Sequence, residues 1–343
     1  MAAPAAARRP AEVTASAGEG ARSPGHAPGS EPGRPNAPGP GRGAGRARAL
    51  ALRVAARYGV PADEVVLAPA QGAASVVHLL GRDLVLKAAL ADAPGPAADL
   101  CKEAAVIPHV RDLGVPTPEL LELGEPAGAA PYLVLRRAPG VSPGEEPGPR
   151  LHRSLGRALA RLHGAAASPP AAVPADAQED PRPGVERLAA DGYLSAGLAR
   201  WLIGWFGALA ARLPAAPPRP VLIHGDVSAG NLLAEPGTGE LTALLDWGDA
   251  ALADPAVEFA KVPPRAVPEV LAGYLGEGGG EERRQWLDRV LWHHLGWALA
   301  RLPTPPEPRL AHWSAQPGNR LLELLRCYAE GPDAGWMRSQ RLP

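Results

Sequence analysis

Hydrophobic positions follow two different spacings in the first part of the chain. Apolar residues with helical spacing begin at Ala49 and stop at Tyr58-Gly59, which predicts one helix. Short apolar runs follow, separated by a small-residue loop at 70–75 and a tight turn at 81–83. These runs predict a meander of three strands, at 64–67, 76–80 and 84–87.

The next segment predicts a helix and two further strands. The helix is expected over 97–112, where Pro108 should kink or split it. Extended chain at 113–118 leads to strands near 119–123 and 132–136. A Pro/Gly-rich stretch at 138–150 then indicates a hinge followed by a loop.

Beyond this hinge the pattern becomes mainly helical. Only two short apolar strands interrupt it, at 220–223 and 241–245. Helices are expected at 151–165, 186–212, 255–275, 282–302 and 319–330. The prediction is an α+β fold of two lobes, a small antiparallel sheet at 49–137 and a larger helical lobe at 138–343.

Residues 1–48 have a different composition from the rest of the chain. They hold 8 Pro, 9 Gly and 7 Arg against 3 Glu, with Val13 as the one β-branched aliphatic residue. Such a segment buries too little apolar surface to offset its ordering entropy. We therefore expect a disordered tail, or a start site that has been misassigned.

Charge and cysteine content exclude several classes of protein. The 343 residues carry a formal net charge of −1, so no basic field favours nucleic acid. The two cysteines, Cys101 and Cys327, form no CxxC pair, which argues against a disulfide framework. No apolar stretch approaches 18 residues, and no signal sequence is evident, so a cytoplasmic protein without a membrane span is expected, of open oligomeric state. Only three lysines occur, Lys87, Lys102 and Lys261, which makes any well-placed lysine informative.

The segment His224-Gly-Asp-Val-Ser-Ala-Gly-Asn231 carries the clearest chemistry, together with Asp246 after the next apolar run. Phosphoryl transfer needs a carboxylate near the attacking hydroxyl and oxygen ligands that hold Mg²⁺ on the nucleotide phosphates. H-x-D-x4-N followed by Asp is the kinase-type arrangement of these groups. One weaker alternative is that these are turn-forming residues between strands. Another is a metal-hydrolase pair of His224 and Asp226, but no further metal ligands follow at a sensible spacing.

The chain from about residue 50 to 300 resembles the aminoglycoside phosphotransferase and choline-kinase-like family, which has a protein-kinase-like fold. The resemblance lies in residues 221–233, 243–250 and 254–260, with supporting echoes at 159–163 and 113–118. It implies that Asp226 is the catalytic base and that Asn231 and Asp246 ligate Mg²⁺. Glu258 stands where the family usually has Asp, a change that preserves the charge.

The nucleotide site is predicted on the first lobe and the hinge. Lys87 closes the third strand of the meander and Glu103 follows on the next helix, matching the Lys and Glu that pair in kinases. By the resemblance, the loop before Ser75 covers the phosphates, and Ser75 is a candidate donor to them. The Arg136 carbonyl and Ala138 amide are the candidates for binding adenine.

The resulting function is an ATP-dependent phosphotransferase, with GTP as the alternative donor, that phosphorylates a hydroxyl of a small molecule. An aminoglycoside-type antibiotic is one acceptor class, and amino alcohols or sugars are others within the family. A nucleotide-binding pseudokinase without catalysis is the alternative of a different class. Among the remaining candidates, His293-His294 are expected to pack on an aromatic helix face rather than bind a metal, Asp249 to be a solvated acid, and Asp254 to cap a helix.

Overall fold

The computed structural model describes residues 40–69, 71, 75–89, 94–125, 130–144, 147–166, 168–276, 280–306, 313–314 and 316–330. Most of the predicted tail, residues 1–39, lies outside these ranges. The helix predicted from Ala49 begins earlier, because α1 spans Pro40–Arg57. Proline is tolerated in the first turn of a helix, and the Ala and Arg residues that follow favour helix. None of the helices in the described ranges is long and apolar enough to cross a membrane.

Five antiparallel strands form the predicted sheet. The strands are β1 (Val65–Leu67), β2 (Ser75–Leu80), β3 (Leu84–Ala89), β4 (Leu120–Gly124) and β5 (Tyr132–Arg136). Their order in the sheet is β1-β2-β3-β5-β4, and every neighbouring pair is antiparallel. The predicted meander and the two further strands are therefore confirmed, with bounds that shift by one to two residues.

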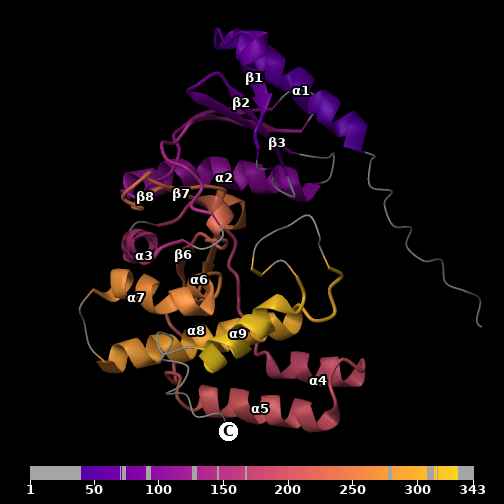
Figure 1. Cartoon of the computed structure of the whole chain (residues 1–343), viewed down its shortest axis with the longest axis vertical. Helices are drawn as coiled ribbons and strands as arrows, with labels where there is room; N and C mark the ends of the chain where they lie inside the picture. Colours follow the sequence, from indigo (N-terminus) through magenta and orange to yellow (C-terminus); the bar gives the residue numbers. More distant parts are fainter. Residues whose placement is uncertain are drawn as a thin grey trace, which may run out of the picture. The chain divides into compact units, whose positions relative to one another are not determined.

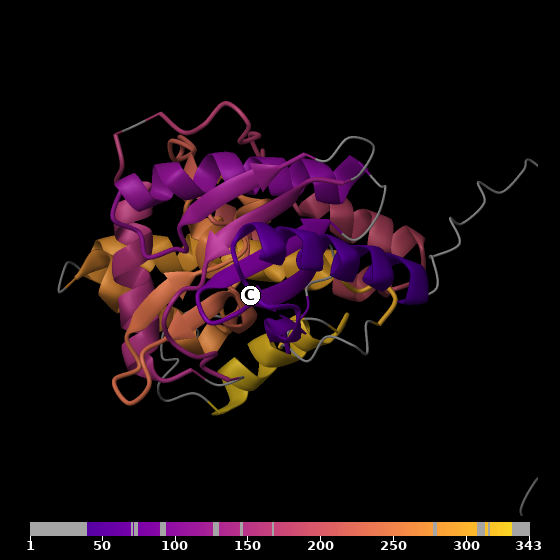
Figure 2. The ribbon, with the colours of Figure 1, turned by 90° about the horizontal axis from the view of Figure 1, so that it is seen from above.

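Helices α1 and α2 cover opposite faces of this sheet (Figure 2). Side chains alternate between the two faces of a strand. Tyr132 and Val134 accordingly pack with α1, whereas Leu133 and Leu135 pack with α2 (Pro94–Asp112). Helix α2 continues through Pro108, so the predicted split does not occur: this exposed residue lies near the helix end and removes a single backbone hydrogen bond.

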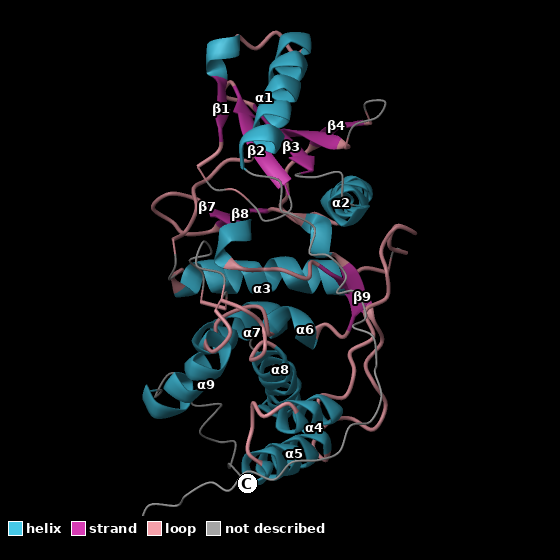
Figure 3. Ribbon diagram, turned by 90° about the vertical axis from the view of Figure 1, so that its right-hand side faces the viewer, coloured by secondary structure: helices cyan, strands magenta, loops and turns pink. Residues whose placement is uncertain are grey.

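The remainder of the chain is mainly helical (Figures 1 and 3). Its helices are α3 (Pro149–His163), α4 (Arg182–Ala190), α5 (Ala196–Ala210), α6 (Ala256–Phe259), α7 (Val267–Leu275), α8 (Gly280–Ala300) and α9 (Asn319–Glu330). Helices α3 and α7 approach closely, because a Cβ at Gly156 would lie 2.0 Å from the Val270 carbonyl oxygen. Together with the sheet, these helices confirm the predicted α+β fold of two lobes.

Two of the predicted helices are each divided into two separate helices in the structure. The helix expected at 186–212 is interrupted between α4 and α5, where Gly192 has a φ of +83° and the Ser195 side chain caps α5. The helix expected at 255–275 is interrupted at Pro263-Pro264, between α6 and α7. Both interruptions contain glycine or proline, the residues that usually end helices, so the sequence did contain the signal for these breaks.

Two small antiparallel pairs of strands carry the chemical residues. The pairs are β6 (Val221–Ile223) with β9 (Ala251–Ala253), and β7 (Leu232–Ala234) with β8 (Leu241–Leu244). Strands β7 and β9 were not predicted, because three residues are too few to show an alternating pattern. The loops after β6 and β8 contain Asp226 and Asp246, so the two strand pairs place both predicted carboxylates.

Candidate active site

The loop that follows β6 requires a glycine at its second residue. Gly225 has a φ of +86°, in the left-handed region that glycine adopts without strain. A Cβ at this position would lie 2.2 Å from the Asp249 carbonyl oxygen. The His-Gly-Asp sequence therefore reflects a close approach of two backbone segments, immediately before Asp226.

His224 is fully buried and ties the two loops together. Its Nε2 donates to the Leu245 carbonyl oxygen at 2.9 Å, and its Nδ1 accepts from the Asp226 backbone N–H at 3.2 Å. The Leu245 N–H in turn donates to the Asn231 carbonyl oxygen at 2.9 Å. Because Leu245 directly precedes Asp246, these bonds fix the loop of Asp226 against the loop of Asp246.

Glu258 binds the start of the loop that contains Asp226. Its fully buried carboxylate accepts from the backbone N–H groups of His224 at 2.6 Å and Gly225 at 3.1 Å. Burial would raise the pKa of Glu258, but the neighbouring His163 and His224 keep that pKa below its usual value. The residue that stands in place of the family's usual Asp is therefore an ionised anchor of the loop.

Asp226 and Asn231 are joined by their side chains. Asn231 Nδ2 donates to the Asp226 carbonyl oxygen and to Asp226 Oδ2, both at 2.9 Å. This contact occupies the amide donor of Asn231 and leaves its Oδ1 for another ligand. Asp226 Oδ1 has no hydrogen-bond partner within the described ranges, so one oxygen of the predicted base can accept from an acceptor hydroxyl.

Lys87 lies between two carboxylates. Its Nζ donates to Glu103 Oε2 at 2.6 Å and to Asp246 Oδ1 at 2.7 Å. Lys87 shares the face of β3 that packs on α2, and Glu103 lies in the stripe of α2 that faces the sheet. The predicted Lys–Glu pair is therefore formed, and it reaches the predicted metal ligand.

Charge and burial act together at this triad. Burial would lower the pKa of Lys87, but Glu103 and Asp246 raise that pKa above its usual value. For Asp246, burial would raise the pKa, whereas Lys87 and His224 lower it. Lys87 and Asp246 are consequently an ammonium and a carboxylate at neutral pH.

Asp246 adopts a backbone conformation that is rare outside glycine. Its φ is +64°, the one positive φ of a non-glycine residue in the described ranges. Aspartate is among the residues that tolerate this left-handed conformation. Thr117 secures the neighbouring backbone, because its Oγ1 donates to the Leu244 carbonyl oxygen at 2.9 Å and accepts from Trp247 Nε1 at 2.8 Å. The 113–118 segment thus helps to position Asp246 from the sheet side.

The other predicted nucleotide residues lie along the sheet. Ser75 is 3% exposed and begins β2, next to a loop of which 70 and 72–74 are outside the described residues. Arg136 ends β5, and its exposed side chain pairs with Glu119. The Ala138 amide has no hydrogen-bond partner within the described ranges. Among the described residues, no hydrogen bond or ion pair joins these three to Lys87, Glu103 or Asp246, and their roles stay predictions.

The oxygen atoms at Asn231 and Asp246 fit Mg²⁺. Magnesium takes oxygen ligands and is usually held by one or two protein side chains together with substrate phosphates. Within the described ranges, no cluster of three or more His, Cys, Asp or Glu side chains could hold a metal by itself. The donor set therefore suits an ion that arrives with a nucleotide better than a resident metal of the protein.

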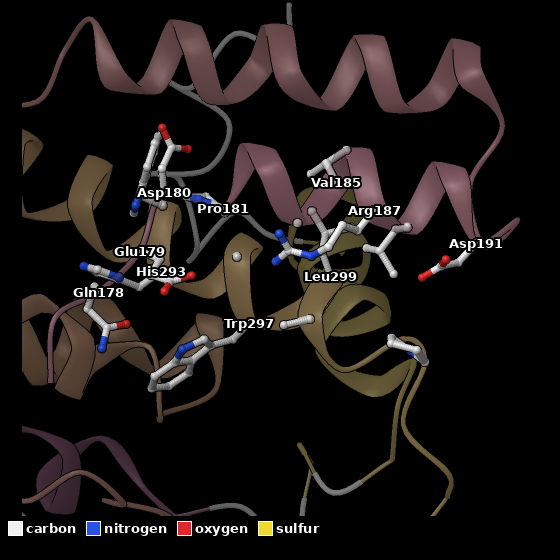
Figure 4. Close-up of a pocket in the computed structure, with 16 residues that line it drawn as sticks. Gln178, Glu179, Asp180, Pro181, Val185, Arg187, Asp191, His293, Trp297 and Leu299 are labelled. Atoms are coloured by element: carbon white, nitrogen blue, oxygen red, sulfur yellow. The ribbon is translucent and has the colours of Figure 1, made fainter. Parts of the chain in front are cut away.

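Lys261 was not singled out by the sequence, although the scarcity of lysine was a usable signal. Lys261 lies two residues after the end of α6, and its Nζ is 4.1 Å from the centre of the Trp297 ring. Trp297 also borders a cavity of about 390 Å³ between α4, α8 and the segment before α4 (Figure 4). Arg187 of α4 and His293 of α8 border the same cavity.

Four further residues were singled out in the sequence, namely Asp249, Asp254, His293 and His294. Asp254 Oδ1 accepts from the N–H of Ala256, the first residue of the short helix α6, at 2.7 Å, while Pro255 and not Asp254 holds the N-cap position. Arg289 and His293 of α8 also contact the Asp254 carboxylate. His293 and His294 are both buried, and Asp249 is exposed.

Comparison with known proteins gives the family. Residues 66–288 match the model of the phosphotransferase enzyme family. This range covers more than half of the chain, which therefore belongs to that family. The chain is accordingly an enzyme of the class that transfers a phosphoryl group to an alcohol group of a small molecule.

Solved structures confirm the protein-kinase-like fold. A choline/ethanolamine kinase family protein from Mesorhizobium loti has a TM-score of 0.59 at 21% identity, over 87% of this chain and 98% of that one. The GDP complex of wild-type aminoglycoside 2'-phosphotransferase-IIIa has a TM-score of 0.53 at 19% identity, over 80% and 89% of the two chains. Macrolide 2'-phosphotransferase MphH from Brachybacterium faecium has a TM-score of 0.51 at 22% identity, over 74% and 92%. No curated protein sequence matches the chain.

Proposed function

We propose that the protein transfers the γ-phosphoryl group of ATP, or of GTP, to a hydroxyl of a small molecule. The observation that carries this proposal is the pair of linked clusters, Asp226 with Asn231 and Lys87 with Asp246, held together through His224 and Leu245. Phosphoryl transfer is catalysed mainly by positioning and charge, and these clusters supply both.

Each residue has a defined part in this proposal. Asp226 Oδ1 accepts the hydrogen bond of the acceptor hydroxyl and orients its oxygen toward the phosphorus. Lys87, held by Glu103, places its ammonium against the nucleotide phosphates. Asn231 Oδ1 and the Asp246 carboxylate would hold Mg²⁺, which neutralises charge on the phosphates when it is bound.

The nucleotide base is proposed to bind at the hinge. The free amide of Ala138 supports this placement, and the Arg136 carbonyl at the end of β5 is the second proposed contact. Ser75 is proposed to donate to a phosphate from the start of β2. The GDP in one structural neighbour makes GTP a donor to test beside ATP.

The acceptor classes to be compared come from the neighbours' names. These names mention an aminoglycoside, a macrolide, and choline or ethanolamine, and each name describes the neighbouring protein that carries it. Identities of 19–22% show the fold and do not select among these acceptors. The antibiotic and metabolite acceptors predicted from the sequence therefore remain candidates.

A screen for phosphorylated products tests the proposal. Purified protein with Mg²⁺ and either ATP or GTP is incubated with hydroxyl compounds of each class, and products are identified by mass spectrometry. We expect a product with one added phosphoryl group that disappears in Asp226→Asn, while Asp249→Asn, an exposed neighbour, retains it. A protein that binds nucleotide but neither hydrolyses nor transfers it is a pseudokinase, and that result refutes the proposal.

A further inference from the structure

Lys261 is a cation beside the proposed base that the proposed reaction does not use. Its Nζ lies over the Trp297 ring, and within the described ranges no carboxylate forms an ion pair with it. Burial lowers the pKa of Lys261, whereas the Asp226 carboxylate raises it. The ammonium is therefore partly desolvated, unpaired and within electrostatic range of Asp226.

Backbone contacts hold Lys261 and Asp226 on the same support. The Lys261 N–H donates to the Glu258 carbonyl oxygen at 3.1 Å. The Glu258 carboxylate binds the two N–H groups that directly precede Asp226. The position of the ammonium relative to the base is consequently fixed by short contacts.

A second cation reinforces the positive charge. Arg320 of α9 is 7% exposed, and its Nη1 donates to the Ala260 carbonyl oxygen at 3.0 Å. Its Cζ lies 5.3 Å from the centre of the Trp297 ring, and Asp226 acts on its charge as it does on that of Lys261. Two cations thus lie against the Trp297 ring, and neither has a carboxylate ion-pair partner within the described ranges.

Contacts place Lys261 on the acceptor side of the site. They join Lys261 through Glu258 to the loop of Asp226, whereas Lys87, Glu103 and Asp246 form a separate triad. The proposed nucleotide phosphates lie instead at Lys87, Asn231 and Asp246. A desolvated cation without a counter-ion costs free energy, which an anionic group of a ligand would offset.

We propose that Lys261 is a specificity residue that binds a carboxylate or phosphate of the acceptor, beside the hydroxyl that Asp226 orients. This inference rests on the proposed phosphotransferase function. Its consequence is a preference for anionic acceptors over polycations such as aminoglycosides, because an ammonium without an ion-pair partner attracts an anionic group and repels a cationic one.

The acidic residues of the nearby cavity do not reverse this preference. Glu179, Asp180 and Asp191 border the cavity but are exposed, so solvent and salt screen their charges (Figure 4). Asp180 also pairs with Arg182. Lys261 and Arg320 are more buried and act closer to the proposed base.

A series of small three-carbon alcohols isolates the effect of charge. Glycerate and glycerol 3-phosphate carry an anion, glycerol is neutral, and 3-amino-1,2-propanediol is cationic. Each is tested as an acceptor and as an inhibitor of the slow hydrolysis of ATP that occurs without acceptor. Wild type is compared with Lys261→Met, which keeps a long apolar side chain, with Lys261→Arg, and with Lys102→Met, a lysine on the nucleotide side next to Glu103, as the control.

We expect at least one anionic compound to exceed glycerol in kcat/KM, or in potency of inhibition, by about 10- to 100-fold, the range for one charge-assisted hydrogen bond. Lys261→Met should remove this preference, Lys261→Arg should restore most of it, and Lys102→Met should leave it unchanged. The preferred member of the anionic pair shows whether the bound group is a carboxylate or a phosphate.

Three results overturn the inference. They are equal behaviour of the charged and neutral compounds, a preference for the cationic compound, and a Lys261→Met variant that keeps the wild-type preference. A Lys261→Met variant that melts at a lower temperature and loses activity equally toward all compounds would also overturn it, because the contact with Trp297 would then be purely structural. Absence of both hydrolysis and transfer is a different outcome, since it refutes the proposed function itself.

Discussion

Replacement of Glu258 by glutamine tests how the loop of Asp226 is held. The carboxylate accepts two backbone hydrogen bonds, at 2.6 and 3.1 Å, from the N–H groups of His224 and Gly225. A glutamine has the same shape, but it offers a single carbonyl oxygen and carries an NH₂ group that cannot accept. One buried donor is then left without a partner, and the charge that strengthens the other bond is lost.

The expected magnitude follows from these two contacts. An unsatisfied buried donor costs about 1–3 kcal/mol, so Glu258→Gln should lower the free energy of unfolding by about 2–4 kcal/mol once the loss of charge is included. The loop geometry should loosen as well, lowering kcat more than nucleotide affinity, because Lys87 and Asp246 are held by other contacts.

Denaturant unfolding and steady-state kinetics measure the two effects. The matched control is Glu269→Gln, which replaces a partly exposed glutamate paired with Arg153 and should change stability by less than about 1 kcal/mol. Equal stability and equal kcat in the two variants would refute the role assigned to Glu258.

Two further predictions concern buried charge. Lys87→Met should destabilise the protein by about 3–5 kcal/mol and weaken nucleotide binding at least about 10-fold, because it removes the ammonium that neutralises the buried Glu103 carboxylate. Addition of Glu103→Gln should recover part of the stability but not the binding, as measured by thermal unfolding and nucleotide titration, and a double variant less stable than Lys87→Met would contradict this account. Asp254, whose pKa is lowered to about 2 chiefly by His293 and Arg289 against the raising effect of burial, stabilises the fold by about 2 kcal/mol above pH 4. Because the pKa of Asp254 is lower in the folded state, this contribution is lost as the pH falls from 4 through 2. The difference in stability between wild type and Asp254→Asn should therefore be constant from pH 7 to 5 and shrink below pH 4. A difference that grows on acidification would contradict this prediction.

Local sequence signals were sufficient for the sheet and for the reacting residues. Lys87 and Glu103 could be paired in advance because a lysine at the end of the third strand and a glutamate on the next helix match the Lys and Glu that pair in kinases. The contact of Asp226 with Asn231 follows from a spacing of five residues within one loop.

Contacts across long separations could not be predicted in the same way. Glu258 binds the loop from more than thirty residues away, and Thr117 contacts Leu244 and Trp247 across an even longer interval. Such pairs depend on tertiary packing, which periodicity does not report. Lys261 reaches Trp297 only because α6 and α8 pack together.

The central claim is that Asp226 orients an acceptor hydroxyl at a nucleotide site formed by Lys87, Asn231 and Asp246. Its most direct test is the rate of phosphoryl transfer by Asp226→Asn, measured with nucleotide affinity in the same preparation. The account predicts that transfer falls by at least about 100-fold, within the range for a general base, while nucleotide affinity stays within a few-fold of wild type. A variant that transfers phosphoryl groups at a near-normal rate would contradict the account.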